Sequence, residues 1–155
     1  MLLSEQFKVI GLGTSTDFNN GFTADSINTE GLHRIMFVLT YGAVGGAGAA
    51  VLTVKSGASA GTQTTAETFY SRYGGAAQGS ADADVYSDWT TGASVAVATA
   101  TITTRTQIVE IDCSAITAGQ PWLTLALSNA ADSGIVHAVA ICVPRYAGNA
   151  IPTAI

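Results

Sequence analysis

The stretch His33-Arg34-Ile35-Met36-Phe37-Val38-Leu39-Thr40-Tyr41 alternates between two kinds of position. Its odd-numbered positions from 35 to 41 are all large and apolar, whereas the even-numbered positions include an arginine and a threonine. Successive side chains of a β-strand point to opposite faces, so a period of two is typical of a strand with one buried face. The stretch therefore predicts a strand with one face in a hydrophobic core. The core-facing residues would be Ile35, Phe37, Leu39 and Tyr41.

Similar short runs recur on both sides of this stretch, separated by clusters of Gly, Ser, Asn and Asp. This spacing is typical of short antiparallel strands joined by turns. We expect about eight strands. The nine candidate ranges are 5–11, 33–41, 50–55, 65–73, 84–89, 95–103, 107–113, 123–127 and 135–143, of which 65–73 and 84–89 are the less regular and are interpreted as edge strands. The apolar runs 95–103 and 135–143 are expected to be covered on both faces. Other side chains expected to face the core are Phe7, Val9, Leu52, Val54, Val109, Ile111, Cys113, Leu123, Leu125 and Leu127.

No segment has a 3.6-residue apolar period over three turns, which excludes a helical domain. Ser114 to Gly119 predicts one short helical turn, with Ser114 as its cap and Gly119 as its stop. The sequence therefore predicts an all-β protein, a two-sheet antiparallel sandwich of the jelly-roll type, over residues 1–155 as a single domain. Its first and last residues would form short apolar arms.

The composition is dominated by small residues and is poor in charge. Only 17 of the 155 residues are charged, 11% of the chain, whereas soluble domains average about 25%. Alanine, threonine and glycine together make 63 residues, and there are only three prolines. A folded protein of this size exposes about 7,300 Å², or one charge per about 430 Å². We infer that much of the surface is covered by partners, because a surface poor in lysine lacks the usual protection against edge pairing.

The distribution of charge argues against several partners. The six Lys and Arg residues are scattered and the net charge is −5, so no basic stripe exists for direct nucleic-acid binding. The sequence has no apolar run long enough to cross a membrane and no basic, apolar leader at its start. We therefore expect a soluble protein made in the cytoplasm of a cell. The two cysteines, Cys113 and Cys142, lack the spacing of a redox or zinc site and are expected to be free, buried thiols.

No segment carries a convincing catalytic, metal or cofactor motif. Gly57 to Gly61 matches the G-x-S-x-G nucleophile elbow, but no helix follows it. Gly11-Leu12-Gly13 lacks the third glycine of a dinucleotide loop and is interpreted as a turn. The remaining candidates are the acidic group Asp82, Asp84 and Asp88, the distant pair His33 and His137, and the neighbouring Glu110 and Asp112. We interpret these as solvated or structural residues, and expect no enzyme and no cofactor.

Large apolar and aromatic residues at strand ends and chain ends are the candidate interface residues. Trp, Tyr and Arg are enriched at interface hot spots, and free chain ends are usually polar. The candidates are Leu2, Leu3, Trp89, Trp122, Arg145, Tyr146, Ile151 and Ile155. Packing within the domain is the alternative interpretation for each. We expect Trp89→Ala to weaken attachment to a partner while leaving the fold intact.

Four stretches carry a resemblance to a known family, at Glu5–Gly11, Val51–Gly61, Thr124–Leu127 and Ala138–Tyr146. Together they resemble the capsid decoration, or cement, proteins encoded beside the major capsid protein of tailed bacteriophages. The resemblance implies a virion protein that binds the outer surface of the icosahedral capsid lattice. It also implies a homotrimer at symmetry axes that stabilises the shell against the pressure of the packaged DNA.

Two other classes of protein remain open on the same sequence. Tyr70, Tyr73, Tyr86 and Trp89 lie within twenty positions, and aromatic platforms of this kind occur in carbohydrate-binding or receptor-binding sandwiches. The other alternative is a structural subunit of another phage lattice, such as a tail tube or baseplate. A ring-forming hexamer would favour the tail, and a stable trimer would favour shell decoration.

Overall fold

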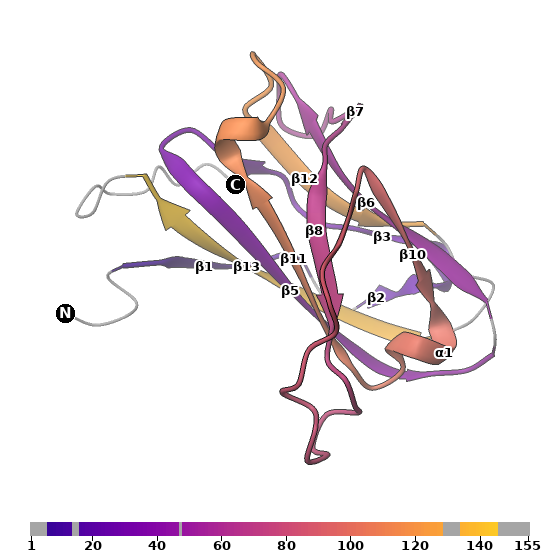
Figure 1. Cartoon of the computed structure of the whole chain (residues 1–155). Helices are drawn as coiled ribbons and strands as arrows, with labels where there is room; N and C mark the ends of the chain where they lie inside the picture. The colour runs from indigo at the N-terminus through magenta and orange to yellow at the C-terminus, as the bar shows by residue number, and fades with distance from the viewer. Residues whose placement is uncertain (1–5, 14–15, 47, 129–133, 146–155) are drawn as a thin grey trace.

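The computed structural model describes residues 6–13, 16–46, 48–128 and 134–145, which form two packed antiparallel sheets (Figure 1). The seven-stranded sheet contains β1 (Lys8–Gly11), β13 (Gly134–Pro144), β5 (Leu32–Val44), β11 (Thr106–Asp112), β8 (Phe69–Tyr73) and β9 (Thr90–Gly92), in that order, with β2 (Thr16–Asp17) also pairing with β13. The six-stranded sheet contains β10 (Ser94–Ala98), β6 (Ala49–Gly57), β12 (Trp122–Leu127) and β3 (Phe22–Thr23), with β4 (Ile27–Asn28) on β12 and β7 (Thr65–Ala66) on β6.

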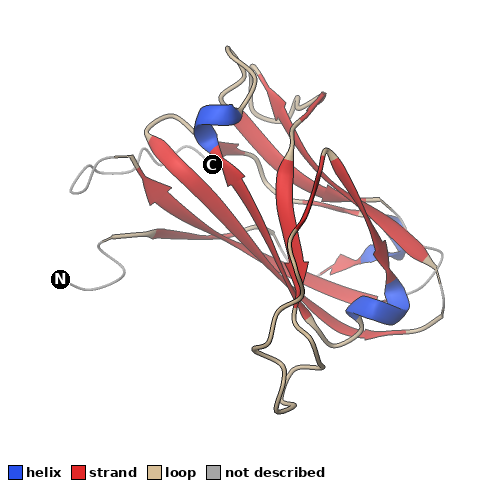
Figure 2. Ribbon diagram, in the orientation of Figure 1, coloured by secondary structure: helices blue, strands red, loops and turns tan. Residues whose placement is uncertain are grey.

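Helical structure is confined to three short segments within the described residues (Figure 2). They are the 3₁₀ turns η2 (Phe18–Asn20) and η3 (Cys113–Ala115) and the single turn α1 (Thr99–Ile102). None of the helices among the described residues is long and apolar enough to cross a membrane. The prediction of an all-β sandwich is therefore confirmed.

Strand order identifies the sandwich as a jelly roll. We count β3 and β4 as one interrupted strand and set aside β2, β7, β8 and β9, which leaves eight strands. Numbered along the chain, these eight run 1-8-3-6 in one sheet and 2-7-4-5 in the other, which is the arrangement of a jelly roll. Seven of the predicted ranges supply strands of this frame, and its remaining strand, formed by β3 and β4, was not predicted. The predicted range 65–73 holds β7 and β8, which lie outside the frame. The main addition is the β8–β9 pair, which widens the seven-stranded sheet beyond β11.

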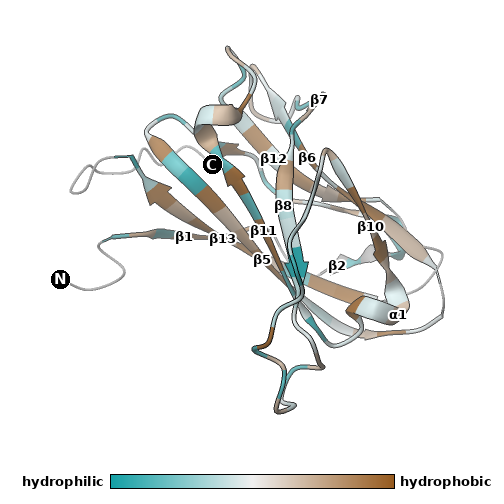
Figure 3. Ribbon diagram, viewed as in Figure 1, coloured by the Kyte–Doolittle hydropathy of each residue, from teal (hydrophilic) through white to brown (hydrophobic). Residues whose placement is uncertain are grey.

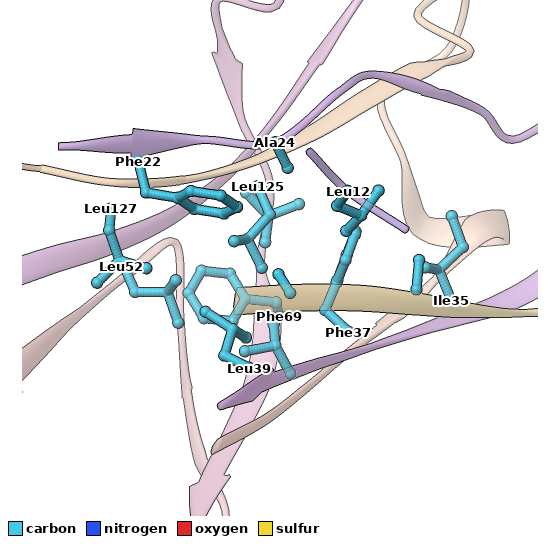
Figure 4. Packing of buried hydrophobic residues seen from close by; sticks show 14 of the residues in the cluster. Leu12, Phe22, Ala24, Ile35, Phe37, Leu39, Leu52, Phe69, Leu125 and Leu127 are labelled. Atoms are coloured by element: carbon cyan, nitrogen blue, oxygen red, sulfur yellow. The ribbon is translucent and has the colours of Figure 1, made fainter. Parts of the chain in front are cut away.

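The two-residue period places the core as predicted. Ile35, Phe37 and Leu39 on β5 are fully buried, and the inner positions of β6, β11 and β12 are buried with them. Side chains from the two sheets point toward one another between the layers (Figure 4). Phe69 enters the core from β8, and Leu12 enters it from the segment after β1. Both thiols are free, as expected, and Cys142 is buried. Cys113 was expected to be buried as well but is only half-buried at the margin of the core.

Several local predictions were wrong. The core-facing residue of β1 is Ile10, and Val9 is 65% exposed, because the register pairs Ile10 with Ala140 on the inner face of β13. Phe7 precedes the strand and is half-buried. Adjacent apolar residues at 9 and 10 left this choice of face ambiguous in the sequence.

The predicted strands at 84–89 and 95–103 also differ from the structure. Residues 84–89 belong to the connection from β8 to β9 and contribute only an isolated bridge between Tyr86 and Gly74. The second strand ends at Ala98, because both the backbone N–H and the hydroxyl of Thr99 donate to the Gly48 carbonyl and the chain turns into α1. The predicted helical turn near residue 114 is η3, and its cap is Asp112, whose carboxylate accepts from the Ser114 N–H.

Neither of the two apolar runs is covered on both faces by the described residues. On β10, Ala96 and Ala98 are exposed. On β13, Val136, Ala138, Ala140 and Cys142 fill the core, while Ile135 is 57% exposed and the next outward residues are exposed or half-exposed. β13 is nevertheless largely hydrophobic along its length (Figure 3). An antiparallel strand with one solvated face usually has polar outward residues, so the outer face of β13 is an exception.

Candidate functional site

Two connected features occupy the outer face of the seven-stranded sheet. Cross-strand register sets Val9, Ile141, Met36, Glu110, Tyr70 and Thr91 in one row across the sheet. The next row contains Val139, Val38, Ile108 and Arg72. Directly opposed residues share a face of a sheet, so both rows point away from the core. The apolar half of these rows lies on β1, β13 and β5 and reaches β11, and the aromatic and charged half lies on β11, β8 and β9.

The apolar half forms a continuous patch, which we call the apolar strip: Val9, Met36, Val38, Ile108, Val139 and Ile141. Val9 is 65% exposed, and Met36, Val38, Val139 and Ile141 are half-buried. Ile108 is buried but lies outside the hydrophobic core cluster, because it faces outward beside Arg72. The strip contains no charged residue. Lys8, the only charged residue of β1, lies opposite Cys142 on the inner side of the sheet.

The other half of the face is hollowed. The aromatic hollow has a volume of about 570 Å³. It is lined by Arg34, Thr68, Tyr70, Trp89, Thr91, Glu110, Ile111, Asp112 and Ala115. This volume lies within the range of about 300–1,000 Å³ that is usual for small-molecule sites. Its residues come from β5, β8, β9, β11 and η3 and from the segments beside them.

Two aromatic side chains form one corner of the hollow. The ring centroids of Tyr70 and Trp89 lie 6.3 Å apart, with their planes at 81°. Tyr70 is 50% exposed and Trp89 is 42% exposed, so each presents ring surface to solvent. Trp89 is therefore a surface residue, which rules out packing in the core. Packing at the rim of the domain, against Tyr70 and Arg72, remains the alternative to an interface role.

Arg72 holds this corner from beside the hollow. Its guanidinium carbon lies 4.2 Å from the Trp89 ring centroid and 4.8 Å from that of Tyr86. The Arg72 Nε is buried, and no described residue offers it a hydrogen bond. The guanidinium stacks on the two aromatic rings, an arrangement that a planar guanidinium favours.

The polar side of the hollow comes from β5 and β11. Arg34 Nη1 lies 3.6 Å from Glu110 Oε2. The Asp112 carboxylate accepts hydrogen bonds from the backbone N–H and the hydroxyl of Ser114, at 2.8 and 2.7 Å. These hydrogen bonds lower the pKa of Asp112 below its usual value. Glu110 and Asp112 share the outward face, as the sequence predicted, but they line a hollow and are only half-exposed.

The structure separates the remaining aromatic and interface candidates. Tyr73 points inward from β8 and its hydroxyl lies 3.4 Å from the Ala96 carbonyl oxygen, so it does not join Tyr70 and Trp89. Burial raises the pKa of Tyr73. Trp122 alternates with buried leucines and therefore faces outward from the six-stranded sheet, on the opposite side of the sandwich from Trp89. Arg145 is exposed just after β13, and its backbone N–H donates to the Gly31 carbonyl. Five candidates lie outside the described residues: Leu2, Leu3, Tyr146, Ile151 and Ile155.

The short motifs that the sequence analysis set aside lie in turns and on the surface. The segment 57–61 follows β6 into a turn closed by a bridge between Ser59 and Thr62. Gly13 has a φ of 91°, in keeping with a turn after β1. His33 and His137 are both exposed. Across the described ranges, no group of three or more His, Cys, Asp or Glu side chains is arranged to hold a metal ion.

The fold and the outer face together define a class: a jelly-roll sandwich with one apolar and hollowed sheet face. The crystal structure of the SPBc2 prophage-derived protein YomS has a similar fold, with a TM-score of 0.50 over 87% of this chain and 92% of that one. The two sequences are 9% identical over this alignment, so the likeness is one of fold. No protein-family model matches the sequence, and no curated protein is similar to it.

Proposed function

We propose that this chain is a non-enzymatic structural protein of a bacteriophage particle, bound to the outer surface of the icosahedral capsid as a trimer. Three observations support the proposal. The four resembling stretches point to capsid decoration proteins, the fold is similar to that of a prophage-derived protein, and the surface carries few charges. Since a jelly roll hosts many functions, the proposal must rest on a surface of this molecule.

The apolar strip is the observation that carries the proposal. β13 has the apolar composition of a strand buried on both faces, yet the described part of the chain leaves its outward side chains exposed or only half-buried. Parallel and sandwich-core strands have this composition because both faces lose contact with water. In a chain with so few charged residues, a strip of five apolar side chains that are exposed or half-buried, arranged around the buried Ile108, supports a docking surface. The capsid lattice is the partner that would cover it.

The free energy of such a contact is sufficient for stable attachment to the capsid when the three copies of a trimer bind together. A standard interface removes about 800 Å² per partner from water. At about 25 cal/mol per Å² this gives a gross gain of about 20 kcal/mol as an upper limit. Association costs about 4–15 kcal/mol. A trimer recovers much of that cost, because its second and third contacts form at a high effective concentration. Stabilisation of the shell would then come from avidity.

Sedimentation with expanded, undecorated capsids of the phage that encodes the chain tests the proposal. The full chain should pellet with these capsids, at a stoichiometry that matches one class of symmetry axis. Val9→Lys places a charge on the most exposed residue of the apolar strip and should abolish pelleting. Val51→Lys is the matched control, because Val51 is 42% exposed on the outer face of the other sheet, opposite Ala96. It should pellet as the wild type does.

Three results would contradict the proposal or the contact surface that it names. A chain that stays monomeric and does not pellet with any capsid is not a decoration protein. An equal loss of pelleting in Val9→Lys and Val51→Lys would show that the apolar strip is not the surface that contacts the capsid. A hexameric ring in gel filtration, with binding to tails and none to capsids, would instead assign the chain to the tail or baseplate.

A further inference from the structure

The aromatic hollow combines two ring surfaces at a right angle with a set of mixed polar groups. The Tyr70 and Trp89 rings meet at 81°, so a planar or chair-shaped group resting on one ring meets the edge of the other. Aromatic rings offer large, rigid, apolar contact surfaces at a low cost in conformational entropy. The corner is therefore suited to a compact ring that has an apolar face.

The polar groups around this corner are balanced in charge and in hydrogen-bonding type. Glu110 and Asp112 supply carboxylate acceptors, Arg34 supplies donors, and Thr68 and Thr91 supply hydroxyls that both donate and accept. An anionic ligand would lie beside two carboxylates. A cationic ligand would lie beside Arg34, and Arg72 already stacks on the exposed aromatic pair from the side. A neutral ligand with many hydroxyls matches both the donors and the acceptors.

The corner is also held in place before any ligand arrives. The Arg72 guanidinium lies between Tyr86 and Trp89. Two hydrogen bonds attach the segment that precedes Trp89 to β8. The Ser87 N–H donates to the Tyr73 carbonyl at 2.8 Å, and the Tyr73 N–H donates to the Ser87 hydroxyl at 3.1 Å. A ring held by its neighbours loses little freedom on binding, which favours recognition.

We propose that the aromatic hollow binds a neutral saccharide, with one pyranose ring packed on the Tyr70 and Trp89 corner. The apolar C–H face of the sugar would lie on an aromatic ring. Its hydroxyls would reach Glu110, Asp112 and Arg34. This site goes beyond the capsid-binding proposal and is independent of it, because none of the residues that line the hollow belongs to the apolar strip.

A glycan array tests the proposal with the full-length chain. The array carries neutral oligosaccharides of glucose, galactose and N-acetylglucosamine beside sialylated, sulfated and phosphorylated glycans. We expect binding to a subset of the neutral glycans. Calorimetric titration with the best of these should show at least a tenfold loss of affinity for Trp89→Ala and for Tyr70→Ala. Glu110→Gln, which keeps the shape of the side chain, should also weaken binding.

Trp122→Phe is the matched control. It removes the tryptophan on the opposite face, leaves affinity unchanged, and makes Trp89 the sole tryptophan of a chain that has two. The emission of Trp89 should then change on adding the glycan. Near-UV circular dichroism checks that each variant is folded. Binding to no neutral glycan, binding confined to anionic glycans, or unchanged affinity in folded Trp89→Ala and Glu110→Gln would each overturn the proposal. None of these outcomes bears on capsid pelleting, which is read with Val9→Lys.

Discussion

The guanidinium carbon of Arg72 lies 4.2 Å from the centroid of the Trp89 ring. Arg72 is on β8, whereas Trp89 ends the long connection that leaves β8 and projects from one end of the sandwich before returning to β9 (Figure 1). A second ring from the same connection, Tyr86, lies on the guanidinium at 4.8 Å. Arg72 lies on β8, just before the connection begins, and stacks on two aromatic residues near the end of the connection. It therefore holds the beginning and the end of this segment together.

Replacing Arg72 with alanine should loosen this segment without unfolding the sandwich. Cation–π contacts contribute about 0.5–2 kcal/mol according to their exposure, so we expect a loss of about 1–2 kcal/mol in the free energy of unfolding. Limited proteolysis should cut residues 74–89 faster in Arg72→Ala than in the wild type. Arg72→Lys should recover little, because an ammonium group does not stack as a planar guanidinium does. Arg145→Ala, at an exposed arginine, is the control and should change stability by less than about 0.5 kcal/mol. An unchanged cleavage rate in Arg72→Ala would show that the stacking does not hold the segment.

A buried polar chain crosses the inner face of the seven-stranded sheet. The Tyr41 hydroxyl donates to Gln107 Oε1 at 2.6 Å, and Gln107 Nε2 donates to the Ser71 hydroxyl at 2.8 Å. All three residues are at most 2% exposed. Tyr41→Phe should therefore cost about 1–3 kcal/mol, because it deprives a buried acceptor of its donor.

The triple variant Tyr41→Phe, Gln107→Leu and Ser71→Ala separates this effect from packing. The triple substitution removes the donors and acceptors of both hydrogen bonds together, so its stability should lie closer to that of the wild type than does the stability of Tyr41→Phe. Urea unfolding of the three proteins measures the difference. If the triple variant is the least stable, the chain contributes net stabilisation through its hydrogen bonds rather than only avoiding a penalty.

Gly57 has no room for a side chain at the end of β6. A Cβ built there would lie 1.9 Å from the backbone oxygen of Thr62, so any substitution must move the turn that follows the strand. Overpacking costs about 1–3 kcal/mol, and we expect Gly57→Ala to fall at the upper end because the obstacle is backbone. Gly45→Ala is the control, since an added Cβ there has no heavy atom within 4 Å. Equal melting temperatures for the two variants would mean that the turn yields freely.

The core was predictable because it depends on short-range alternation. The inner residues of β5, β6, β11 and β12 repeat every second position, so a single strand is enough to reveal them. The core-facing side of β1 was not predictable, because Val9 and Ile10 are both apolar and only the pairing of β1 with β13 decides which of them faces the core. Likewise, the end of β10 depends on a hydrogen bond from Thr99 to Gly48, which is distant in sequence.

The aromatic hollow was predictable only in part. Tyr70, Tyr86 and Trp89 are close in sequence and were noted as a group, and outward positions were correctly assigned to Glu110 and Asp112. Their meeting depends on the pairing of β11 with both β8 and β5, which opposes Glu110 to Tyr70 on one side and Asp112 to Arg34 on the other. Arg72 gave no signal of its own, because nothing in the sequence distinguishes a stacking arginine from a solvated one.

The two thiols should make the protein less stable in alkaline solution. Burial raises the pKa of Cys142 to about 11 and that of Cys113 to about 12. In the unfolded chain these thiols ionise at a lower pH, so unfolding releases protons once the pH exceeds the ordinary thiol pKa. Their contribution is therefore complete below about pH 8.5 and is lost as the pH rises through the folded values. Each thiol can lower the free energy of unfolding by at most about 1.4 kcal/mol per pH unit within that window.

Cys142→Ala removes one of these groups and should flatten the alkaline decline, even though it lowers stability at neutral pH by shrinking a buried side chain. Urea unfolding under reducing conditions, from about pH 8 to 10.5, measures both effects because the window begins near the ordinary thiol pKa. Tyr41 and Tyr73, whose pKa values burial also raises, act in the same direction above about pH 10 and remain in the variant. The comparison of slopes below that pH therefore isolates the thiol. Parallel slopes in Cys142→Ala and the wild type would show that Cys142 is as easily ionised in the folded protein as in the unfolded chain, and that the sheet around it admits water.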